Sequence, residues 1–64
     1  MALKLNVPTI DGSDSAKYLW EMIITAEPEA KVEIDPTAKT VTIESEASEE
    51  TFKQVIEAAG HKIA

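Results

Sequence analysis

The sequence has no cysteine and no surplus of positive charge. With no cysteine among the 64 residues, disulfides, thiolate metal ligands and thiol nucleophiles are all excluded. The 12 acidic residues outnumber the 6 basic ones and give a formal net charge of −6. Because this charge repels phosphate backbones and anionic lipid surfaces, we expect neither a nucleic acid nor a membrane as the partner.

Long apolar runs are missing as well. No stretch approaches the roughly 18 to 20 apolar residues that a membrane-spanning helix needs, and the N-terminus has no basic segment followed by an apolar one. We therefore expect a cytoplasmic protein with a single domain over residues 1–64. A chain of this size buries only about 60% of its unfolded surface, so any large apolar residue outside the core needs an explanation.

The first half of the chain has the pattern of a strand followed by a helix. Residues 3–7 alternate apolar and polar side chains, which is typical of a strand with one buried face. Asp11 or Ser13 can accept hydrogen bonds from the first turn of a helix, which we expect to continue to about Ala26.

The second half repeats the pattern with a hairpin in place of the first strand. Alternation over 31–35 and 40–44, joined by a turn that starts at Pro36, predicts two paired strands. Ser48 is a good N-cap for a second helix ending at Gly60, and residues 61–63 leave room for a last strand. This order predicts an α+β, ferredoxin-like βαββαβ fold, in which a four-stranded antiparallel sheet carries both helices on one face.

A resemblance to a known family extends over nearly the whole chain. It rests on three segments, "LKLNVPTI", "KVEIDPTAKTVTIES" and "ASEETFKQVIEAAGHKI". In this order and spacing the sequence resembles the small bacterial-type copper chaperones of the heavy-metal-associated (HMA) domain family. In that family, two cysteines separated by two residues hold Cu(I) in the loop after the first strand, and some members add a histidine after the second helix. Here Gly12 and Ser15 take the places of the cysteines, and His61 takes that of the histidine.

The resemblance implies the fold but not the activity. Cu(I) is a soft ion that thiolates hold, and this loop offers only hard oxygen ligands. We therefore expect no copper transfer and no cofactor, and also no enzyme, because His61 has no nucleophile or orienting partner in a recognisable motif. The plain interpretation of the loop is a solvated turn, and the alternative is a divalent-metal site made by Asp11, Asp14 and His61.

The first helix is more apolar than its position requires. The stripe expected to face the sheet consists of Ala16, Leu19, Ile23 and Ala26. Trp20 and Ile24 lie on one flank of that stripe, and Tyr18 and Met22 lie on the other. Together they widen the apolar arc to roughly 240°, against the ~100° that a surface helix usually shows. The second helix has a stripe of ordinary width.

Aromatic side chains and Met with few charges are typical of the centre of a protein interface. We therefore predict a non-enzymatic protein-binding module that contacts another protein, or a second copy of itself, through these four residues. Its polar rim would consist of Ser13, Asp14, Lys17 and Glu21. One alternative is that Trp20 and Met22 extend a thin core. Another is that the chain is a redesigned scaffold with no partner.

Two histories fit the loss of both cysteines together with apolar residues clustered on one helix. One is a natural family member that retained only protein binding. The other, which we expect, is an engineered variant of the scaffold with its metal site removed and an interface installed on the first helix.

Overall fold

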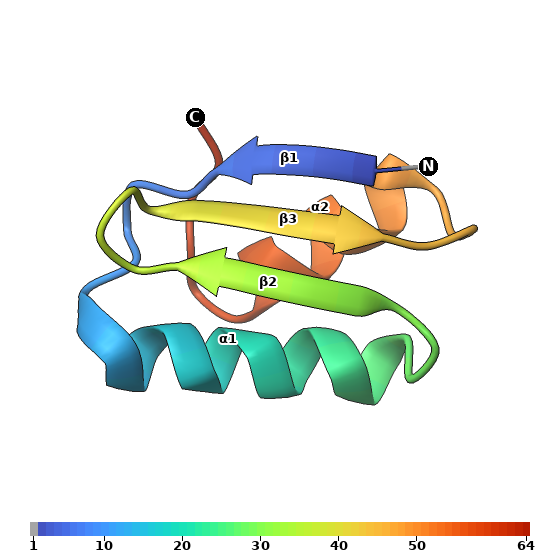
Figure 1. Cartoon of the computed structure of the whole chain (residues 1–64), viewed down its shortest axis with the longest axis horizontal. Helices are drawn as coiled ribbons and strands as arrows, with labels where there is room; N and C mark the ends of the chain where they lie inside the picture. The colour runs from blue at the N-terminus through green and yellow to red at the C-terminus, as the bar shows by residue number, and fades with distance from the viewer. Residues whose placement is uncertain (1) are drawn as a thin grey trace.

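The computed structural model describes residues 2–64 as a sheet packed against two helices (Figure 1). Along the chain the elements are β1 (Ala2–Asn6), α1 (Gly12–Ala26), β2 (Lys31–Asp35), β3 (Thr40–Glu44) and α2 (Glu49–Ala58). The strands are antiparallel and stand in the order β1-β3-β2, so β3 is the central strand. Helix α1 runs beside β2 and also contacts α2, which lies behind the sheet in the view of Figure 1.

The core lies between the sheet and the helices. Val41 and Ile43 of β3 are buried, and the register places Leu5 of β1 and Ile34 of β2 on either side of Val41. The buried residues come from β1, β3, both helices and the loops: Leu5, Val7, Ile10, Ala16, Leu19, Ile23, Ala30, Val41, Ile43, Phe52 and Ile56. Ile10 is fully buried although it lies in the loop before α1, where no strand or helix periodicity marks it.

The predicted fourth strand does not form, so the four-stranded prediction is corrected to three within residues 2–64. The end of the chain runs antiparallel to β1 but bonds to that strand only where the Ala64 N–H donates to the Asn6 carbonyl oxygen, at 2.9 Å. The Lys62 N–H instead donates to Thr9 Oγ1 at 3.0 Å, in the loop beyond β1. A single backbone bond does not make a ladder, and the outer edge of β1 stays largely open.

The hairpin forms as predicted, and a side chain that the sequence pattern did not single out holds its turn. Asp35 Oδ1 accepts hydrogen bonds from the backbone N–H of Thr37 at 2.9 Å and of Ala38 at 3.1 Å. This arrangement, typical of an Asx turn, spans Pro36, and the turn ends at Lys39, whose φ is 57°. The chain reverses tightly there and β3 can return alongside β2.

The two helices begin differently. Ser48 caps α2 through its hydroxyl, which accepts from the Thr51 N–H at 3.3 Å, as predicted. Asp11 is the N-cap of α1, but its side chain makes no capping bond, so the predicted side-chain cap is wrong. The chain enters α1 through Gly12 with φ at +88°, a left-handed conformation that glycine adopts at low cost. Within residues 2–64 neither helix is both long and apolar enough to cross a membrane.

An ion pair supports the exposed side of α2. Lys53 Nζ lies 2.7 Å from Glu49 Oε2, one helical turn away. The hydrogen bond to Glu49, together with its negative charge, raises the pKa of Lys53. Because the pair faces solvent, its contribution to folding stability is small.

The contrast between the two N-caps predicts different costs of removing each side chain. Ser48→Ala should lower the free energy of unfolding by about 1 kcal/mol, because the Thr51 N–H loses its acceptor. Asp11→Ala is the matched control and should lower it clearly less, since only a charge near the helix dipole is lost. Urea denaturation followed by circular dichroism measures both, and an equal loss would contradict the assignment of the caps.

Candidate functional site

Helix α1 is held by a narrow buried stripe. Ala16, Leu19 and Ile23 are buried against the core, as the helical spacing predicted. Ala26, predicted to belong to the same stripe, is exposed. It is the last residue of the helix, where the chain turns away toward β2, so this prediction is corrected.

Part of the remaining apolar surface of α1 is open to solvent. Tyr18 is 53% exposed and Trp20 42% exposed, and they are the two exposed large hydrophobic side chains within residues 2–64. Met22 and Ile24 are half-buried. The helix therefore presents two aromatic side chains, and each has an aliphatic or thioether side chain one turn further on, partly covered by the fold.

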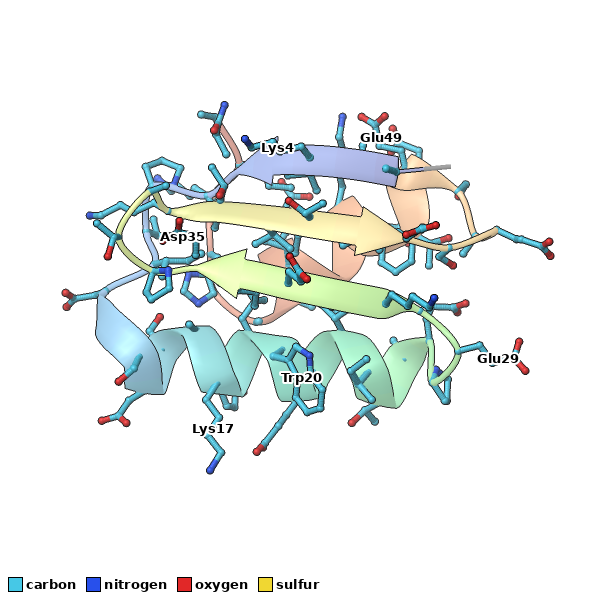
Figure 2. The ribbon with its side chains drawn as sticks, in the orientation of Figure 1. Lys4, Lys17, Trp20, Glu29, Asp35 and Glu49 are labelled. Atoms are coloured by element: carbon cyan, nitrogen blue, oxygen red, sulfur yellow. The ribbon has the colours of Figure 1, made fainter. Side chains whose placement is uncertain are left out.

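The two aromatic side chains lie on different flanks of the helix. Figure 2 shows the Trp20 indole at the front of α1, whereas α2 lies behind the sheet in Figure 1. The Trp20 flank of α1 therefore faces away from α2. At about 100° per residue, Ile24 lies on the same flank as Trp20. Tyr18 lies on the opposite flank, and the outward face of the helix separates the two.

Polar side chains surround and separate the two flanks. Figure 2 shows Lys17 pointing away from the sheet, on the outward side of α1. The four predicted rim residues are all exposed: Ser13, Asp14, Lys17 and Glu21. Two of them are acidic and one is basic, so the rim has a net negative charge.

The loop that precedes α1 is joined to the end of the chain by hydrogen bonds. Thr9 Oγ1 lies 2.8 Å from His61 Nδ1 and also accepts from the Lys62 N–H. Sequence reasoning did not single out Thr9, because its role depends on the approach of a segment more than fifty residues away. His61 is therefore engaged in holding the tail against the loop.

The structure does not assemble the alternative metal site. Within residues 2–64 no three His, Asp or Glu side chains come together in a way that could hold a metal ion. Asp11 and Asp14 are exposed at the start of α1, and the hydrogen-bond partner of His61 is Thr9. Gly12 and Ser15, at the positions expected for the cysteines, supply no thiolate.

A second surface feature lies near the start of β2. A hollow of about 470 Å³ opens there, and its lining residues are Glu27, Glu29, Lys31, Glu44, Ser45, Glu46 and Ala47. Four of these are carboxylates and only one is a cation. The negative charge of the chain is therefore high where β2 begins, close to the end of α1.

Solved structures with the same architecture include copper chaperones. The chain is 32% identical to a histidine-to-tyrosine mutant of the copper chaperone Atx1 from Synechocystis PCC6803, solved in a trimeric form. The TM-score is 0.92 over 97% of this chain and 98% of that one. It is 34% identical to a cyanobacterial copper metallochaperone, ScAtx1, with a TM-score of 0.83 over 100% of both chains. A gold binding protein shares the fold alone, at 21% identity and a TM-score of 0.87 over 95% of this chain and 97% of the other.

These similarities identify the class of protein. The chain belongs to the family of Atx1-type copper chaperones, which have the HMA fold. The resemblance predicted from the sequence is thereby confirmed. No protein-family model and no curated protein matched the sequence.

The exposure of Trp20 predicts that its loss affects folding little. Trp20→Ala should lower the free energy of unfolding by less than about 1.5 kcal/mol, whereas Leu19→Ala, next to it in sequence but fully buried, should cost about 2–5 kcal/mol. Urea denaturation of the two variants gives the comparison. A loss for Trp20→Ala as large as that for Leu19→Ala would place the indole in the core.

Proposed function

We propose that this chain is a non-enzymatic protein-binding module on a copper-chaperone scaffold, engineered to lack the metal site and to present an apolar face on α1. Tyr18, Trp20, Met22 and Ile24 are the contact residues. The observation that supports this proposal most directly is the exposure of both aromatic side chains on a domain small enough to need its apolar residues for the core.

The chemistry of this face suits a protein partner. Trp and Tyr contribute much of the binding energy in protein interfaces, because a large ring can be buried at a small entropic cost and its polar atom can still form a hydrogen bond. The partly covered Met22 and Ile24 hold the edges of the face in place. Because the face stands on a helix packed by a buried stripe, we expect binding with little change in the backbone.

The composition of the loop before α1 supports the proposal that copper binding is lost. Without a thiolate, the scaffold has no soft ligand for Cu(I), and its loop oxygens suit harder ions that bind only where several ligands converge. The similar Atx1 protein from Synechocystis was solved in a trimeric form. Self-association of that relative makes a second copy of this chain the main alternative occupant of the α1 face.

The proposal is tested by comparing the affinities of the parent chain and its variants for a protein that the parent captures. For a captured protein, Trp20→Ala should weaken binding by about 30-fold, equivalent to about 2 kcal/mol, because a central anchor is lost. Gln54→Ala, an exposed position on α2, is the matched control and should leave the affinity unchanged. Surface plasmon resonance with the purified proteins measures both.

Two results would contradict the proposal. Equal binding by the parent and the Trp20→Ala variant would mean that the α1 face is not used. Sedimentation at increasing protein concentration shows whether the chain forms a dimer, and a dimer dissociated by Trp20→Ala would assign the face to a second copy.

Metal titration tests the other half of the proposal. Calorimetry with Cu(I) and with Zn²⁺ should detect no stoichiometric complex, whereas the double variant Gly12→Cys, Ser15→Cys should gain Cu(I) binding because two thiolates are restored. Gly12→Cys alone is the control for strain, since φ at +88° disfavours a side chain there. A stoichiometric complex of the parent that His61→Ala abolishes would instead favour a metal-handling protein using Asp11, Asp14 and His61.

A further inference from the structure

We infer that the partner binds as an extended segment that pairs with the open edge of β2 and packs against the Trp20 flank of α1. This inference rests on the proposed function and specifies the form and chemistry of the partner. The segment would become a new edge strand, with apolar side chains at alternate positions and Lys or Arg between them.

The backbone groups at the β2 edge are available for pairing. In an antiparallel ladder, alternate residues turn their N–H and C=O groups toward the same neighbour. The Val7 N–H donates to the Lys39 carbonyl oxygen at 2.8 Å. In β3, odd-numbered residues therefore turn their backbone N–H and C=O groups toward β1, and even-numbered residues turn theirs toward β2. The register then turns Glu33 toward β3 and leaves the backbone groups of Val32 and Ile34 facing outward.

Those outward groups have no partner in the described part of the chain. The sheet ends at β2, and no backbone hydrogen bond joins Val32 or Ile34 to any segment beyond it within residues 2–64. Two N–H and two C=O groups are thus spaced as the ladder of a further strand requires. The β1 edge is less suitable, because Ala64 already occupies the Asn6 carbonyl there.

An apolar wall stands beside this edge. The side chains of Val32 and Ile34 are half-buried, as expected for residues whose side chains turn toward the helix layer at an uncovered edge. Helix α1 runs beside β2. Figure 2 shows the Trp20 indole at the front of this helix, and Ile24 follows one turn later. Side chains of an added strand that turn to the same side would pack against this wall and cover more of the indole.

The charge around β2 favours basic residues between the apolar residues of the added strand. On the solvent side of β2 the exposed residues are Lys31, Glu33 and Asp35, and Glu27 and Glu29 precede the strand. The local surplus is negative, in line with the net charge of −6. Opposite charges on paired strands stabilise a sheet, so a strand with Lys or Arg opposite Glu33 is favoured.

A second copy of the chain is a poorer occupant of the same edge. The antiparallel register that pairs Val32 of each copy with Ile34 of the other places Glu33 directly opposite its own counterpart. Like charges facing each other across strands are destabilising, and each copy also carries a net charge of −6. We therefore assign the edge to a basic, extended segment of a different protein.

A synthetic peptide tests this assignment with the whole chain. The probe is acetyl-Lys-Val-Lys-Val-Lys-Val-Lys-amide, and its matched control has the same sequence with alternate backbone nitrogens methylated, which removes the N–H donors and keeps the charge. Titration followed by ¹⁵N–¹H NMR should show the amides of Val32 and Ile34 protected from hydrogen exchange. The methylated peptide should bind at least about ten-fold more weakly, because it cannot form the ladder.

Protein variants supply an independent comparison. Ile34→Pro removes an edge N–H that faces solvent, a substitution that edge strands tolerate, and should weaken peptide binding by about ten-fold. Lys4→Pro is the control for a proline at a sheet edge, because its N–H faces outward at the β1 edge. Ile34→Ala keeps the N–H and is the control for loss of the Ile34 side chain, which packs against the core. Circular dichroism establishes that all three variants are folded.

The outcomes separate this inference from the proposed function. Equal binding of the plain and methylated peptides, or no binding of either, overturns the β2 pairing. In that case, loss of a captured partner on Trp20→Ala would still support the α1 face. Protection of Val32 and Ile34 that rises with protein concentration without any peptide would assign the edge to a second copy and overturn the basic strand.

Discussion

The packing of α1 and α2 onto one face of a sheet centred on β3 is the constraint from which the other features follow. Val41 and Ile43 are buried in that central strand, and Leu19 and Ile23 of α1 are fully buried in the same core. A sheet of three short strands has room for one narrow stripe of each helix. The aromatic residues outside the α1 stripe are consequently left at the surface, whatever their hydrophobicity.

The loop before α1 has no cysteine, although the fold is that of the copper chaperones. The architecture is close to that of copper chaperones at 32–34% identity, and the core of this chain consists of apolar residues from strands, helices and loops. Val7 and Ile10 are the residues of this loop in that core. Gly12, at one of the positions expected for the cysteines, is exposed, so a change there removes no core contact. Thr9 and His61 keep the loop tied to the end of the chain, and a glycine opens α1. Fold alone therefore does not specify activity in this protein.

The surface around α1 and β2 carries three features. They are an exposed aromatic ring on α1, an uncovered strand edge at β2 and a local surplus of negative charge. Each is ordinary when taken separately, since edges, single exposed aromatics and acidic surfaces are common. Together they offer backbone groups for strand addition and an apolar surface for alternate side chains, and the charge favours a basic strand.

Local patterns in the sequence determined the helices, the hairpin, the Ser48 cap and most of the core, because periodicity and capping depend on neighbouring residues. They also pointed to the excess of apolar residues on α1. Only the tertiary structure decided that residues 61–63 form no strand, that Ile10 is buried and that Thr9 binds His61. It also decided that Trp20 is exposed while Ile24 is half covered, since burial depends on which segments pack alongside, and these are distant in the sequence.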